Sequence, residues 1–338
     1  MKSLYFLGLI GLLAAALHAQ PPTTGTVWWS TTPIDCSSVD NVPAGSSYTI
    51  SLPSGATGYY CYVSGTFPWL AAGSGYVTAL RVAAPASGAV GVDYSFYDTG
   101  GNSQNLDTTL AGGSSPASGN DVNFVLSVNQ PAEVDLFGAQ GDAPNYSNLK
   151  TGSVFAQFYC PNANTCLTVL PQLIYSAPPT ISLSVPIAWD GLEWTQWSAE
   201  GIDDGGAHRM SLVIYNQAKV AAIYTVRVYD STGAQLGIGT TPAIAGYSTV
   251  TGEAGTYGDL LSNIVKTSLP SGILKVLVDG GSNNSTVLML QGNGRAIATL
   301  QVGYDSAPSG GSTSTSALQT SPKRAPSKPR HISNPVTK

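Results

Sequence analysis

One pattern occurs twice in this sequence, and the duplication restricts the possible folds more than any other feature. Residues 78–101 and 210–233 align without a gap. The matched positions are Leu80 with Leu212, Val82 with Ile214, Val92 with Tyr224, Tyr94 with Val226, Phe96 with Val228, Tyr97-Asp98 with Tyr229-Asp230 and Gly101 with Gly233. We interpret the match as an internal duplication of the scaffold, which by itself identifies no ligand or substrate.

Both copies have the period of β-strands. In the first, apolar residues recur at every second position, and Arg81, Asp93 and Ser95 fall between them. In the second, the same phase places Ser211, Thr225 and Arg227 toward water, as in an antiparallel sheet with one solvated face. The connectors 84–89 and 216–221 have equal length, which preserves the phase. The pattern therefore predicts a strand, a turn and a strand in each copy.

The correspondence extends beyond this central motif. A Trp-x-Ala-x-Gly run precedes it at 69–73 and at 197–201, and the strand candidates 152–158 and 272–278 also correspond. A tryptophan packed over a sheet end beside a glycine turn explains the first feature as scaffold. Pro178-Pro179 marks the expected joint between the copies, because proline cannot donate to a strand ladder.

Many short strands separated by turn signals predict an all-β protein. We expect two tandem immunoglobulin-like or fibronectin-like β-sandwich domains, at 20–176 and 177–305. A jelly roll or a small barrel is the alternative, because the number of strands does not distinguish these architectures.

A known module has similar motifs. Phe67-Pro68-Trp69 with Ala71, Gly73 and Gly75, then a strand, a turn and Phe96-Tyr97-Asp98 with a glycine turn, resemble a repeated β-sandwich module of secreted bacterial proteins of unknown function. In that module the first strand ends in Asn-Pro, whereas Ala84-Pro85 and Asn216-Gln217 each keep half of this pair. The resemblance covers 67–175 and 197–304. It implies an extracellular structural or binding module and brings no catalytic residues.

The two ends of the chain differ from its body. Residues 1–19 have the features of a secretory signal, with Lys2, an apolar run and Ala19 before the expected cut. The run is short for a membrane span, so we expect no transmembrane segment after signal removal; an uncleaved anchor is the alternative. Residues 306–338 form a predicted disordered basic tail. This tail either tethers the protein to an anionic envelope or polysaccharide surface or acts as a solubilising end.

Four cysteines agree with export, because all lie in turn-rich segments. Cys160 and Cys166 bracket a five-residue loop, which leaves Cys36 and Cys61 as the second pair. We favour the disulfides Cys36–Cys61 and Cys160–Cys166. Zinc binding is the alternative, but the spacing does not match the usual zinc knuckles.

Residues 189–208 concentrate aromatic and acidic side chains. Aromatic faces beside carboxylates suit a sugar-binding cleft, and paired carboxylates suit glycoside hydrolysis. The candidate ligand-binding residues are Trp189, Glu193, Trp194, Asp203, Asp204 and His208. Scaffold packing and ordinary turn chemistry at 203–206 are the competing explanation, and calcium binding is a further alternative. His208 is the one histidine of the body, which disfavours a multi-histidine metal site.

Charge narrows the choice of partner. All 19 acidic residues lie between Asp35 and Asp305, and an acidic body argues against nucleic acid. We predict a non-catalytic structural, adhesive or binding protein, extracellular or periplasmic, without cofactor or metal. Its expected partner is a cell-surface polysaccharide or another protein. The alternative is a carbohydrate-binding protein or glycoside hydrolase that uses residues 189–208.

Overall fold

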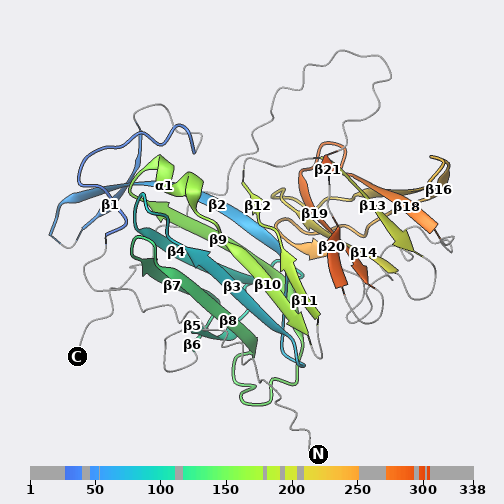
Figure 1. Ribbon diagram of the computed structural model, residues 1–338, viewed down its shortest axis with the longest axis horizontal. Coiled ribbons are helices and arrows are strands. Elements are labelled where there is room, and N and C mark those ends of the chain that lie inside the picture. Colours follow the sequence, from blue (N-terminus) through green and yellow to red (C-terminus); the bar gives the residue numbers. More distant parts are fainter. Residues whose placement is uncertain are drawn as a thin grey trace, which may run out of the picture.

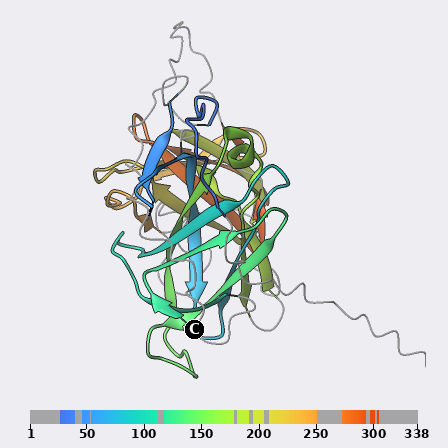
Figure 2. The ribbon, with the colours of Figure 1, turned by 90° about the vertical axis from the view of Figure 1, so that its left-hand side faces the viewer.

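The computed structural model describes residues 27–39, 46–52, 54–110, 117–177, 181–190, 195–203, 209–250, 272–292, 297–300 and 303–304. Within these ranges the protein is all-β, with four antiparallel sheets and one short helix, α1 (Ala163–Thr168). The first half of the chain (27–190) and the second half (195–304) lie side by side in Figure 1. In Figure 2 the first half faces the viewer. The predicted signal at 1–19 and the predicted tail at 306–338 lie outside the described residues.

The first half contains two sheets. Sheet 1 has the order β1 (Tyr48–Ser51), β2 (Thr57–Ala72), β9 (Lys150–Cys160), β4 (Val90–Asp98) and β7 (Asp121–Leu126), with β12 (Ala188–Trp189) also paired to β2. Sheet 2 has the order β11 (Ile181–Val185), β10 (Gln172–Ala177), β3 (Val77–Ala83), β8 (Pro131–Ala139), β5 (Leu106–Leu110) and β6 (Ala117–Gly119).

The second half contains two further sheets. Sheet 3 has the order β16 (Gln235–Thr240), β15 (Thr225–Asp230), β18 (Gly272–Asp279), β13 (Gln196–Asp203) and β21 (Gly303–Tyr304). Sheet 4 has the order β17 (Thr249–Val250), β14 (Arg209–Asn216), β19 (Ser285–Gly292) and β20 (Ile297–Leu300).

The two halves connect their strands in the same order. The series β12-β2-β9-β4-β7 in sheet 1 has the counterpart β21-β13-β18-β15-β16 in sheet 3. The series β11-β10-β3-β8 in sheet 2 has the counterpart β20-β19-β14-β17 in sheet 4. Strands β11 and β12 follow Pro178-Pro179 in the chain but pair with first-half strands. The change from the first pair of sheets to the second therefore falls between Trp189 and Thr195, and not at the two prolines.

The repeated strand-turn-strand motif is not a hairpin. β3 belongs to sheet 2 and β4 to sheet 1, just as β14 belongs to sheet 4 and β15 to sheet 3. The connectors therefore carry the chain from one sheet to the other. The alternating apolar residues of both copies point inward, as the sequence predicts, and all ten aligned apolar side chains of 80–96 and 212–228 are buried.

Two hydrophobic cores hold the sheets together. Side chains from sheets 1 and 2 share the larger core, which also contains Val213, Leu288 and Leu290 from sheet 4. Met210, Leu212 and their neighbours on sheet 4 point the other way, into the second-half core. Sheet 4 is thus buried on both faces between the two cores. The expectation that Ser211 faces water is wrong, because sheet 4 packs against the first half and only 7% of this residue is exposed.

Two disulfides secure one end of sheet 1. Cys36 is bonded to Cys61 and Cys160 to Cys166, which is the pairing that the sequence favours. Cys61 and Cys160 are direct cross-strand partners on β2 and β9, yet each is bonded to a residue outside the ladder. One bridge ties the N-terminal segment to β2, and the other ties α1 to β9.

Candidate functional site

The acidic residue of each repeated Tyr-Asp motif closes a turn. Asp98 Oδ1 accepts hydrogen bonds from the backbone N–H groups of Gly100 and Asn102, at 2.9 and 2.8 Å. The following Gly101 has φ of 81°, a conformation that glycine adopts without strain. The sequence pattern thus marks a turn in the first half, and its carboxylate is held by backbone groups.

The second turn has the same construction. Asp230 Oδ1 accepts from the Thr232 hydroxyl at 2.6 Å, from the Ala234 N–H at 2.9 Å and from the Thr232 N–H at 2.8 Å. The hydrogen bond from the Thr232 hydroxyl and that from the Ala234 N–H lower the pKa of Asp230 from its ordinary value. This carboxylate therefore stays ionised and fixed in place.

Of the six ligand-binding residues predicted from 189–208, the structure describes the side chain of Trp189 alone. Trp189 lies on β12 and packs against the first-half core, with its ring 5.8 Å from that of Phe158. Glu193, Trp194, Asp204 and His208 lie outside the described residues, as does the side chain of Asp203. The neighbouring Asp190 accepts a hydrogen bond from the Ser64 hydroxyl of β2. Trp189 is therefore a partly buried residue that packs against the core of the first half.

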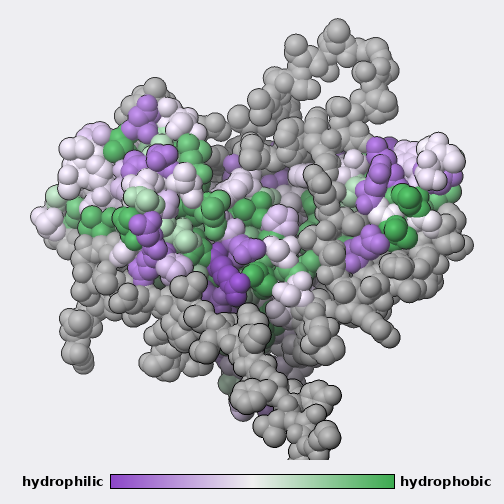
Figure 3. Space-filling view, viewed as in Figure 1, coloured by the Kyte–Doolittle hydropathy of each residue, from purple (hydrophilic) through white to green (hydrophobic). Residues whose placement is uncertain are grey.

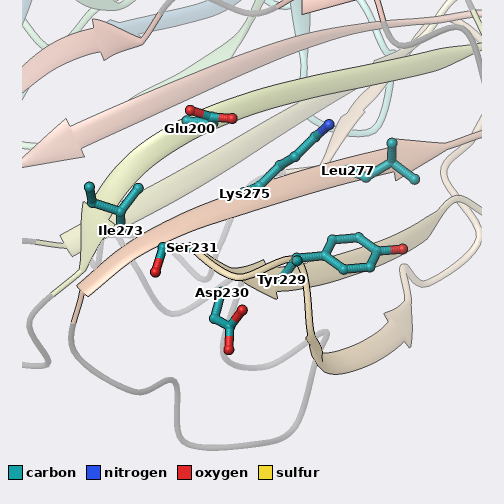
Figure 4. Close-up of a pocket in the computed structure, with 8 residues that line it drawn as sticks. Glu200, Tyr229, Asp230, Ser231, Ile273, Lys275 and Leu277 are labelled. Carbon is teal, nitrogen blue, oxygen red and sulfur yellow. The ribbon is translucent and has the colours of Figure 1, made fainter.

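An open hollow lies on the outward face of sheet 3 (Figure 4). Its volume is about 610 Å³. It is lined by Glu200, Tyr229, Asp230, Ser231, Gly233, Ile273, Lys275 and Leu277. These residues come from β13, β15, β18 and the turn that follows β15. We call this feature the sheet 3 hollow.

The strand register explains why these side chains lie together. Lys275 on β18 is paired with Glu200 on β13 and with Tyr229 on β15, so the three form a row across the sheet. Leu274 and Val276 on either side of Lys275 point into the second-half core. Ile273, Lys275 and Leu277 must therefore point outward, because successive side chains of a strand alternate between its faces.

The outward face combines apolar and charged groups. Ile273, Ile202 and Ile238 are 55%, 44% and 51% exposed, respectively, and β18 pairs Ile273 with Ile202. In Figure 3 hydrophobic and hydrophilic residues lie next to one another at the right-hand end of the molecule, where Figure 1 places β13, β16 and β18. A face with this composition offers both apolar contact and hydrogen bonds to a ligand.

An ion pair borders the hollow on the same face. Arg227 Nη1 lies 3.1 Å from Asp279 Oδ2. Partial burial by itself would raise the pKa of Asp279, but hydrogen bonds from the Gly281 N–H and from Arg227 outweigh it, and the pKa is lowered. The pair is half-buried and lies next to Leu277, since Arg227 is the cross-strand partner of this leucine.

Most of the residues that line the hollow are not marked as site residues by the sequence. Glu200 lies within the segment 189–208, but the pattern predicts a turn at Tyr229 and Asp230 and an ordinary strand at Lys275. A signal was present in 272–278, because this strand has apolar residues at both its odd and its even positions. When the residues at the even positions fill the core, the apolar residues at the odd positions are left on the surface.

Comparison with protein-family models, with curated proteins and with solved structures yields no significant match. No helix among the described residues is long and apolar enough to span a membrane. Within the same residues, no three His, Cys, Asp or Glu side chains gather closely enough to hold a metal ion. The described residues form an all-β, disulfide-containing protein with an open hollow on sheet 3.

Proposed function

We propose that the protein is a secreted, non-catalytic binding or structural module that acts at the cell surface or in the extracellular space. In this proposal the chain is an internal duplication that forms two immunoglobulin-like or fibronectin-like β-sandwiches, from 27 to 190 and from 195 to 304. The shared strand order of the two halves supports the duplication. The resemblance to a repeated module of secreted bacterial proteins agrees with it.

One observation carries the functional part of the proposal. Three prominent residues of the repeated motifs serve the scaffold: Asp98 and Asp230 close turns, and Trp69 packs in the first-half core. The open surface of sheet 3 offers exposed apolar and charged groups to a partner. Two disulfides support an oxidising compartment, since such bonds persist outside the cytoplasm.

Expression of the full chain with its own first 19 residues tests this proposal. The protein should be recovered from the medium, the periplasm or the cell surface, and mass spectrometry should find the new N-terminus near Gln20. Alkylation without reduction should label none of the four cysteines. Recovery in the cytoplasm with four reactive thiols would contradict the proposal.

A further inference from the structure

We infer that the sheet 3 hollow binds a neutral oligosaccharide, with Tyr229 as the stacking platform and Lys275 and Glu200 as hydrogen-bonding groups. This inference rests on the proposed binding role and names the class of ligand. The ligand is identified by the combination of groups that line the hollow.

The apolar part of the lining suits the carbon face of a sugar ring. Tyr229 is half-buried on the outward face and its ring lies beside the strand that carries Leu277 and Ile273. Aromatic rings contribute contact area with a polar end, which matches a ligand that has both C–H and O–H groups. Three adjacent strands span about 10 Å, so the row from Glu200 to Tyr229 can accommodate about two linked rings.

The charged part of the lining suits hydroxyl groups rather than a charged polymer. Glu200 accepts hydrogen bonds, and Lys275 on the neighbouring strand donates them. Asp230 adds a second carboxylate whose position is fixed by its turn. The lining thus has two acids and one lysine, which disfavours a polyanion. The charged row in the middle of the face disfavours a purely apolar ligand such as a lipid chain.

The first half provides an internal comparison. Tyr97 corresponds to Tyr229, and its partner on β9 is Ser153, where the second half has Lys275. Ser153 is 1% exposed, so this position of sheet 1 is covered. The cross-strand partner of Tyr97 is therefore not available to a ligand. In the second half the partner of Tyr229 is Lys275, which lines the hollow together with Ile273 and Leu277.

Affinity electrophoresis of the mature, disulfide-bonded protein tests the inference. Native gels would contain graded amounts of one soluble neutral polymer each: a β-glucan, a xylan, a mannan or a galactan, with polygalacturonate as the anionic control. We expect at least one neutral polymer to retard the wild type. Tyr229→Ala and Lys275→Ala should each weaken the affinity about ten-fold, the equivalent of one lost stacking contact or one lost charged hydrogen bond.

Matched variants separate this site from general effects. Lys219→Ala removes an exposed lysine of the β14–β15 connection and should leave the affinity unchanged. Tyr229→Phe keeps the ring and should bind nearly as well as the wild type. A thermal melt of each variant shows whether it is folded. If Tyr229→Ala is unstable, Lys275→Ala alone tests the site.

Three results would overturn the inference. The first is that none of the four neutral polymers retards the protein. The second is that retardation persists unchanged in Tyr229→Ala and Lys275→Ala. The third is that polygalacturonate is the one polymer that retards the protein, and that Lys219→Ala and Lys275→Ala reduce this retardation equally. Such a result would indicate nonspecific attraction between lysines and the anionic polymer. Each of these results contradicts the oligosaccharide site alone. The proposed function is still supported if the protein is secreted with both disulfides formed.

Discussion

The hydroxyl group of Tyr224 donates a 2.8 Å hydrogen bond to Oδ1 of Asn216, and the aligned positions of the first half are Val92 and Ala84. A buried polar pair in one half thus takes the place of an apolar pair in the other. Asn216 is fully buried, and its Nδ2 donates to three backbone carbonyls, those of Val220, Ile244 and Ala245. The pair joins the end of β14 to the beginning of β15. Burial raises the pKa of Tyr224, so its hydroxyl remains a donor.

Tyr224→Phe should lower the free energy of unfolding by about 1 kcal/mol, because it removes the buried hydroxyl that donates to Oδ1 of Asn216 and lies within hydrogen-bonding distance of the Asn284 carbonyl. Asn216→Ala should cost about 3 kcal/mol or more, since it leaves several buried backbone groups without this partner. Urea unfolding of the single variants and of Asn216→Ala with Tyr224→Phe measures the coupling, which we expect to be about 1 kcal/mol. Simple additivity of the two changes would contradict the pairing.

The turn at Asp230 should make stability depend on acid pH. Hydrogen bonds lower its native pKa, so the unfolded chain binds a proton more tightly than the native protein does. The stabilisation is therefore complete above the unfolded value and is lost as the pH falls through the native value. Asp230→Asn should have a lower urea midpoint than the wild type at pH 6, and the two midpoints should converge in acid. Ser231→Ala is the control, and a difference that stays constant down to pH 2 would refute the role of this carboxylate.

The two disulfides should contribute unequally. Their sequence separations are 25 for Cys36–Cys61 and 6 for Cys160–Cys166. On the chain-entropy model, these loops correspond to about 3.5 and about 2 kcal/mol, respectively. Urea unfolding of two variants, each with both cysteines of one disulfide replaced by alanine, shows which disulfide contributes more to the free energy of unfolding. Peptide mapping without reduction should recover both bonds, and a Cys61–Cys160 peptide would contradict the pairing.

The two halves should unfold together, because sheet 4 contributes to both cores. Leu288 is 1% exposed and belongs to the core of the first half, although it lies on β19 of the second. Leu288→Ala should cost about 2 to 4 kcal/mol. Ile273→Ala, on the exposed face of sheet 3, is the matched control and should change stability little. Fluorescence and circular dichroism should report one common transition for the wild type; two separate transitions would show that the halves are independent.

The inward faces of the strands could be predicted from the sequence, but their partners could not. Alternation assigns Leu80 and Val92 correctly to a core, because the side-chain period of a strand is two. Alternation does not show that the two lie on different sheets. Nor does it reveal that β12 returns to pair with β2, since a two-residue strand has almost no pattern of its own.

The residues that line the hollow are brought together by the register between β15 and β18, which cannot be derived from the sequence alignment of the two halves. The sequence alignment matches Gly152 with Gly272, and therefore Ser153 with Ile273. In the ladders Tyr97 lies opposite Ser153, whereas Tyr229 lies opposite Lys275. The two halves thus differ by two residues in this pairing, a shift that keeps every inward side chain inward. It also places Lys275, and not Ile273, beside Tyr229.

The double burial of sheet 4 affects how β14 is aligned with its neighbours. Met210, Leu212 and Ile214 enter one core, and Val213 and Tyr215 are buried on the opposite face. A one-residue slip would exchange one apolar set for another, so hydrophobicity alone gives weak protection against it. Asn216, at the end of the same strand, meets its three carbonyl partners in the observed alignment. A single insertion or deletion within β14 should therefore destabilise the protein mainly by breaking the hydrogen bonds of the Asn216 side chain, and less by changing either core. One polar residue thus fixes the register of sheet 4, the layer between the two cores.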